Sequence, residues 1–92
     1  MGFLVNNIRP ELAEKYMIQE DSGIVITDIF PNGVAIKAGL VTGDLIIALN
    51  GKKVDSRRQF NEMLAKISEE GSIFLLVRRG EDSIHIALPQ KG

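Results

Sequence analysis

The segment 38–51, Ala-Gly-Leu-Val-Thr-Gly-Asp-Leu-Ile-Ile-Ala-Leu-Asn-Gly, constrains the fold more than any other part of the chain. Gly39 suits the end of a short helix, and Gly43 allows a tight turn in which Asp44 can accept hydrogen bonds from backbone N–H groups. The almost continuously apolar run 45–49 is typical of a buried strand, and the Asn-Gly pair that follows it favours a chain reversal. The spacing therefore predicts a helix end, a turn, a core strand and a second turn, in that order.

Length and composition restrict what such a segment can belong to. A chain of 92 residues that is 45% hydrophobic supports one domain, spanning 1–92, with one modest core. The net charge of −1 gives no basic face for nucleic acid, and no apolar run reaches the roughly 18 residues of a membrane-spanning helix. No cysteine is present and His85 is the one histidine, so we expect no metal site and no cofactor.

Apolar periodicity and turn residues predict the remaining elements. The helix at about 56–68 begins with a capping box of Ser56 and Gln59, carries an apolar stripe typical of core packing, and ends at Gly71. Arg78 and Arg79 lie beside the expected hairpin loop 79–82 and are interpreted as surface charge, and His85 as a solvent-facing strand residue. The expected strands are 3–8, 24–30, 45–49, 73–77 and 83–88, and the expected short helices are about 10–17 and 33–38.

The series at 38–51 resembles the central motif of a PDZ domain. The resemblance covers essentially the whole chain. The entry segment 3–15 and the final hairpin, 75–80 with 84–88, are similar to the last PDZ domain of bacterial HtrA/Deg serine proteases. It implies an α+β, mainly β fold: a partly open barrel or sandwich of five to six strands capped by the long helix. In this circularly permuted bacterial type, the carboxylate-binding loop lies at the N-terminus.

The resemblance also implies a peptide-binding site. Met1-Gly2-Phe3 matches the hydrophobic-Gly-hydrophobic loop whose amides bind a carboxylate, and Phe3 and Val5 would line the pocket for the last peptide side chain. Arg57 matches the position that often contacts the antepenultimate peptide residue. The full set of expected peptide-binding residues is Met1, Gly2, Phe3, Leu4, Val5, Arg57, Asn61 and Leu64.

The function implied is recognition of hydrophobic C-termini by β-strand addition. The expected partners are C-terminal peptides of unfolded or signalling proteins and a parent protease domain, in a periplasmic or extracytoplasmic setting, with the isolated domain a monomer. Two alternatives stay open: an assembly module of a secretion-system or site-2-protease-type membrane protein, and an autonomous small enzyme. Asp21-Ser22-Gly23 resembles a trypsin-like nucleophile segment but is interpreted as a turn, because a triad needs a nearby histidine base.

Overall fold

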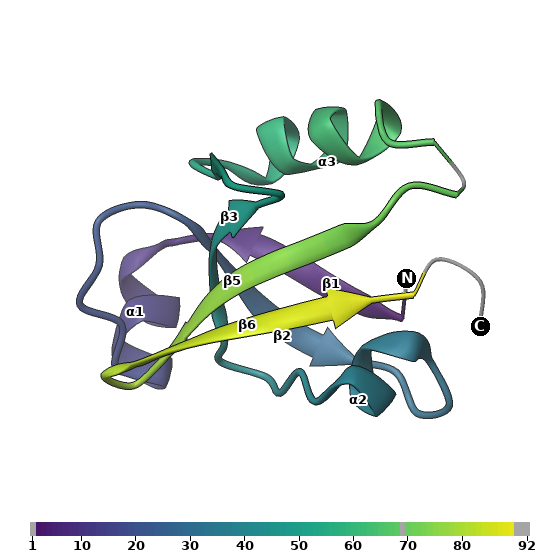
Figure 1. The fold of residues 1–92 in the computed structure, drawn as a ribbon. Helices are drawn as coiled ribbons and strands as arrows, with labels where there is room; N and C mark the ends of the chain where they lie inside the picture. The colour runs from purple at the N-terminus through teal and green to yellow at the C-terminus, as the bar shows by residue number, and fades with distance from the viewer. Residues whose placement is uncertain (1, 69, 90–92) are drawn as a thin grey trace.

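Six strands and three helices make up the part of the chain that the computed structural model describes, residues 2–68 and 70–89. Figure 1 shows α3 and α2 on opposite sides of the strands, with α1 near the turn between β5 and β6. In chain order the elements are β1 (Phe3–Asn7), α1 (Pro10–Tyr16), β2 (Ile24–Ile29), α2 (Val34–Ala38), β3 (Leu45–Leu49), β4 (Lys52–Lys53), α3 (Arg57–Ala65), β5 (Ile73–Arg79) and β6 (Asp82–Leu88).

The strands form one antiparallel sheet in the order β1-β2-β3-β5-β6, with the short β4 paired to β3. Because the path has two ends, the sheet is open, and β1 and β6 are its outer strands. This architecture confirms the predicted partly open, mainly β fold with one principal helix. The β4 strand was not predicted, because two lysines after an Asn-Gly turn carry no strand signal.

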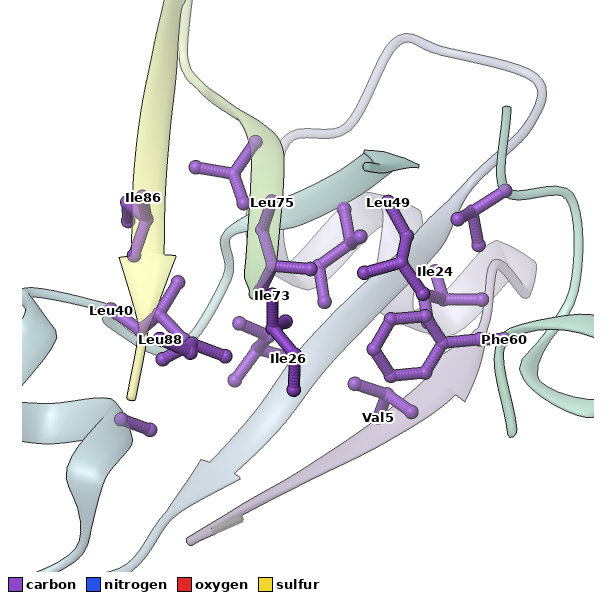
Figure 2. Packing of buried hydrophobic residues seen from close by; sticks show 14 residues of the cluster. Val5, Ile24, Ile26, Leu40, Leu49, Phe60, Ile73, Leu75, Ile86 and Leu88 are labelled. Carbon is purple, nitrogen blue, oxygen red and sulfur yellow. The ribbon is translucent and has the colours of Figure 1, made fainter. Parts of the chain in front are cut away.

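The core lies between the sheet and α3 and is almost entirely aliphatic. Phe60 of α3 points toward Val5 of β1 and Ile24 of β2, so the long helix and the outer strand share one packed layer (Figure 2). The buried cluster contains Val5, Ile24, Ile26, Ala35, Leu40, Ile46, Leu49, Val54, Phe60, Ile73, Leu75, Val77, Ile86 and Leu88. Packing of this kind fixes the position of α3 relative to β1, and the candidate site lies between them.

Helix α3 is shorter than the predicted 56–68. Ser56 caps its start by accepting a hydrogen bond from the Gln59 N–H at 3.1 Å, as expected, but the Gln59 side chain bonds to the N–H of Asp55, one residue before the usual capping-box partner. The helix ends at Ala65, because the next two amides bond three residues back and tighten the last turn. Gly71 is therefore not the helix terminator, although Ile67 still packs against the core.

Other boundaries shift by one or two residues. Helix α1 ends at Tyr16, since Met17 adopts a left-handed conformation (φ 56°) and its N–H caps the helix. Helix α2 ends at Ala38 and is capped by Gly39 (φ 97°), as predicted. The final hairpin is tighter than expected: β5 and β6 pair out to Arg79 and Asp82, which leaves a two-residue connection. Hydrogen bonds across a ladder extend strands beyond the point at which the apolar alternation stops.

Candidate functional site

The outer edge of β1 is open. Strand β1 pairs with β2 on one side, and within residues 2–68 and 70–89 no strand pairs with its other side. The N–H of Phe30 donates to the carbonyl oxygen of Gly2 at 2.9 Å, so this carbonyl faces the sheet. In a trans peptide the carbonyl and the next N–H point in opposite directions, and the Phe3 N–H is therefore directed toward the open edge.

Gly2 has a backbone conformation that other residues rarely adopt. Its φ is +88°, and a Cβ placed on it would lie 3.2 Å from the Cα of Gly33, the residue that precedes α2. A side chain at this position would meet both a conformational penalty and a close backbone neighbour. Met1, the first residue of the expected loop, lies outside the described residues.

Side chains alternate along β1 as the sequence predicts. Val5 is buried in the core and Phe3 packs partly buried against it, so both face the α3 side of the sheet. Leu4 points to the other face and is 46% exposed, so its backbone, rather than its side chain, is available at the expected site. Leu64 of α3 is also half-buried against the core, so the structure brings apolar groups from the strand and the helix to one side of the edge.

A hollow of about 730 Å³ follows α3 from its first residue toward its last. Two of the expected site residues, Arg57 and Asn61, line it, and Leu64 does not. The other lining residues were not predicted, although those on α3 recur at intervals of four residues along one face of the helix. The complete lining is Asn7, Arg57, Arg58, Asn61, Glu62 and Ala65.

The end of β1 and the start of α3 are joined by a hydrogen bond. The N–H of Arg57 donates to Oδ1 of Asn7 at 2.7 Å. The two residues are 50 positions apart, so nothing local in the sequence marks the pair. This bond fixes the distance between the last residue of β1 and the first residue of α3. It also gives a hydrogen-bond partner to one of the otherwise unsatisfied amides of the first helical turn.

The motif at 38–51 is held by an ion pair between the buried Asp44 and the partly exposed Arg79. Asp44 is fully buried and accepts from the Val41 N–H at 3.1 Å, as predicted for this turn. Nε and Nη2 of Arg79 donate to the two carboxylate oxygens of Asp44, each at 2.8 Å, and Nη2 also donates to the Gly39 carbonyl. The hydrogen bond to Asp44 raises the pKa of Arg79 above its ordinary value.

Arg78 and Arg79 lie partly exposed at the surface, as predicted, but each also forms an ion pair that was not predicted. Arg79 binds a carboxylate 35 positions away, and Arg78 pairs with Glu20 at 3.0 Å and donates to Ser83. Their sequence neighbours Glu81 and Asp82 suggested local charge balance, whereas the sheet brings more distant carboxylates closer to them. Both pairs tie the end of β5 to other segments of the fold.

The remaining polar residues singled out from the sequence stay apart. Ser22 lies in the bend before β2 and His85 is exposed on β6, and β3 and β5 separate these two strands in the sheet. Among the described residues there is no group of three or more His, Cys, Asp or Glu side chains arranged to hold a metal ion. The helices in that part of the chain are all too short to cross a membrane.

Two curated relatives show what the chain is similar to. A protein of Chlamydia pneumoniae named "Probable periplasmic serine endoprotease DegP-like" is 39% identical over 89 residues, which is 96% of this chain and 18% of that protein. Serine protease HTRA1 of Xenopus laevis is 36% identical over 73 residues, which is 79% of this chain and 15% of that protein. The chain thus spans less than a fifth of either relative.

Solved structures share the fold. The HtrA3 PDZ domain bound to a phage-derived ligand (FGRWV) has a TM-score of 0.81 at 26% identity, covering 97% of this chain and 81% of that one. The HtrA-type protease AlgW with a decapeptide has a TM-score of 0.84 at 26% identity, covering 96% of this chain and 27% of that one. The sequence profile of the PDZ domain matches residues 1–89. The chain therefore belongs to the PDZ domain family.

Proposed function

We propose that this domain binds the hydrophobic carboxyl terminus of an extended peptide, which adds as a strand to the open edge of β1. The observation that carries the proposal is the direction of the Phe3 N–H, which faces this open edge beside the positive-φ glycine. Peptides that extend a sheet gain main-chain hydrogen bonds from any sequence, and side-chain pockets supply the preference.

Each expected site residue has a role in this mode of binding. The amides around Gly2 and Phe3, with Met1 before them, bind the terminal carboxylate. The backbone of Leu4 and Val5 continues the strand pairing upstream. Phe3, Val5 and Leu64 are apolar and meet on one side of the edge, so they are placed to contact the last side chain of the peptide. Arg57 and Asn61 line the hollow beside the upstream residues.

The energetics correspond to a weak, reversible contact. One or two buried side chains contribute about 1.5–3 kcal/mol each. About four hydrogen bonds near 1 kcal/mol each, plus charge-assisted bonds to the carboxylate, contribute several more. Association costs at least about 4 kcal/mol, and the remainder is on the order of −8 kcal/mol, or a Kd near 1 μM.

The names of the relatives extend the proposal to the parent protein. We propose that the chain is the substrate-binding or regulatory domain of an HtrA/Deg-type serine endopeptidase outside the cytoplasm, since two relatives are named serine proteases and one of them periplasmic. The domain itself then carries no catalysis. It would capture C-termini of unfolded or signalling proteins for a separate protease domain, and in isolation it would be a monomer. The two solved neighbours that contain peptides support the peptide-binding part.

NMR titration of the 92-residue domain tests the mechanism directly. The probes are a peptide with a hydrophobic last residue and its C-terminally amidated twin. We expect the free acid to shift amide signals at residues 2–5 and 61–64, and the amide to bind at least tenfold more weakly, because the charge-assisted bonds to the terminal carboxylate are lost. Equal binding of the two peptides, or shifts confined to the β6 edge, would remove the carboxylate-capture mechanism.

A further inference from the structure

The chain contains two Asn-Gly pairs, Asn32-Gly33 and Asn50-Gly51. Both asparagines are exposed and left-handed, with φ values of 69° and 50°. An asparagine that precedes glycine is especially prone to lose its side-chain amide, because glycine has no side chain to keep its backbone nitrogen away from the amide carbon. The two sites share sequence, exposure and backbone conformation, so they differ in what holds each side chain.

The side chain of Asn50 is held by residues at the start of β5. Its Nδ2 donates to the carbonyl oxygen of Ser72 at 3.0 Å, and its Oδ1 accepts from the Phe74 N–H at 2.8 Å. The backbone N–H of Asn50 also donates to the Phe74 carbonyl oxygen at 2.8 Å. The amide carbon of Asn50 can therefore approach the Gly51 nitrogen only after both side-chain bonds have been broken.

The side chain of Asn32 has no such restraint. Among the residues that the structure describes, none forms a hydrogen bond with it. Asn32 follows Pro31 in a turn closed by a long hydrogen bond, 3.4 Å, from the Gly33 N–H to the Phe30 carbonyl oxygen. Proline followed by a residue of positive φ is typical of a type II turn, so Asn32 serves the turn through its backbone. Nothing holds its amide away from the Gly33 nitrogen.

The Asn32-Gly33 peptide lies beside the loop that is proposed to bind the peptide carboxylate. A Cβ on Gly33 would be 3.1 Å from the Cα of Gly2. Figure 1 shows the connection between β2 and α2 next to the start of β1. The N–H of Phe30 in the same turn bonds to the Gly2 carbonyl oxygen at 2.9 Å, so this turn orients the Gly2–Phe3 peptide.

We propose that Asn32 is a deamidation site of this domain, and that its conversion to aspartate or isoaspartate weakens the binding of a peptide carboxylate at Gly2 and Phe3. The site itself is inferred from the chain alone. Its effect on binding rests on the proposed function.

The reaction needs water as its one co-reactant. The backbone nitrogen of Gly33 attacks the side-chain amide carbon of Asn32, and the proton of that nitrogen passes through water to the departing amide group, which leaves as ammonia. The product is a five-membered succinimide, and water then opens one of its two C–N bonds. Opening at the side-chain carbonyl gives aspartate, and opening at the main-chain carbonyl gives isoaspartate. Either product carries a carboxylate in place of a neutral amide.

Both changes oppose the binding of a carboxylate. The new negative charge is next in sequence to the glycine that contacts Gly2, and it repels the end of a peptide bound there. Isoaspartate also lengthens the main chain by one carbon immediately before Gly33, where the contact with Gly2 leaves no spare room. The longer turn shifts Phe30, whose N–H holds the Gly2 carbonyl. Isoaspartate is therefore expected to have the larger effect.

Peptide mapping tests the site. The folded 92-residue domain is incubated in warm, mildly alkaline buffer and digested, and mass spectrometry detects the gain of about 1 Da at each asparagine. Enzymatic methylation of isoaspartyl groups identifies the isoaspartate. We expect position 32 to convert at least about fivefold faster than position 50, which must first open locally. A parallel incubation in urea should bring the two rates within about twofold, because unfolding releases position 50. Equal rates in the folded domain, or a ratio that survives unfolding, would overturn the assignment.

Calorimetric titration of the modified domain with a peptide that ends in valine tests the effect. Anion exchange isolates the isoaspartate form by its added charge, and its Kd is expected to be at least about threefold higher than that of the unmodified domain. Asn32→Asp adds the charge without the extra carbon and should give an intermediate Kd. Asn32→Gly keeps the positive φ without an amide, so it should bind normally and resist the reaction. Gln19→Glu, an equal change of charge at an exposed position outside the turn, should leave the Kd unchanged.

The two experiments separate this inference from the function on which its second part rests. If the unmodified domain binds the acid and the amidated peptide equally, the carboxylate site is wrong, and the mapping still decides whether position 32 is the deamidation site. If the unmodified domain prefers the acid but the isoaspartate form binds it equally well, strand addition stands and the proposed effect of the modification is wrong.

Discussion

At the scale of single residues, the backbone conformation of Gly2 determines what the edge of β1 can bind. Gly2 combines a φ of +88° with a backbone neighbour 3.2 Å from the place where a Cβ would be. The hydrophobic-Gly-hydrophobic pattern predicted a special conformation here, because glycine is the residue that adopts it at little cost. The packing of Gly2 against Gly33 was not predictable, since it joins segments 31 positions apart.

Replacing Gly2 by alanine is therefore expected to weaken peptide binding by tenfold or more, because a φ of +88° is unfavourable for alanine and the added Cβ would crowd Gly33, both of which favour a different orientation of the Gly2–Phe3 peptide. The backbone strain should also lower the free energy of unfolding by about 1–2 kcal/mol. Isothermal titration calorimetry and urea denaturation measure the two effects. Gly51→Ala is the matched control, since Gly51 has φ +82° with nothing within 4 Å of an added Cβ. It should show the stability loss and normal binding. Normal binding by Gly2→Ala would contradict the role given to this residue.

At the scale of elements, local patterns located the strands and helices, and long-range contacts decided where they end. The apolar run 45–49 and the stripe on α3 were recognised because burial imposes its period on the sequence. The end of α3, the short β4 and the pairing of Arg79 were missed. Each depends on what the rest of the fold brings alongside, such as a carboxylate 35 positions away.

The Asp44–Arg79 pair connects the turn before β3 to the end of β5, and its loss is expected to loosen both. Arg79→Met leaves a fully buried carboxylate whose one remaining hydrogen-bond donor within residues 2–68 and 70–89 is the Val41 N–H, which should cost about 2–4 kcal/mol of unfolding free energy. Arg78→Met is the control on the same strand. Its pair with Glu20 is about one-third exposed on each side and should cost less than about 1 kcal/mol. Equal losses in urea denaturation would show that the burial of Asp44 does not set the difference.

The raised pKa of Arg79 defines how this pair responds to alkali. A folded-state pKa above the unfolded value means that the stabilisation is fully present below the unfolded pKa and is lost only as pH rises through the folded one. Both pKa values lie above the pH of ordinary buffers, so Arg79 keeps its charge in them whether the domain is folded or unfolded. Titration of Arg79 therefore gives the pair no pH dependence at neutral or moderately alkaline pH.

At the scale of the whole molecule, a packed core supports a sheet whose outer strand β1 has one unpaired edge. The core, α3 and the pairing with β2 fix β1 on one side, while its outer amides have no strand partner in the described part of the chain. The resemblance read from the sequence located this edge and its glycine. The hollow and the bond between Asn7 and Arg57 emerged only from the structure, because they unite the first strand with a helix 50 positions later.

Completing this edge with a ligand should stabilise the entire domain, because a peptide that needs the folded groove binds only the native state. At tenfold excess over Kd the linkage contributes about 1.4 kcal/mol, which for a domain of this size raises Tm by about 5–10 °C. Differential scanning fluorimetry with a peptide that ends in valine and with its C-terminally amidated twin measures the effect. The amidated peptide should give a much smaller rise in Tm. The same experiment on Gly2→Ala should show almost no ligand-induced shift, whereas Gly51→Ala should show the full one from a lower starting Tm. A full shift in Gly2→Ala would mean that the peptide binds elsewhere on the domain.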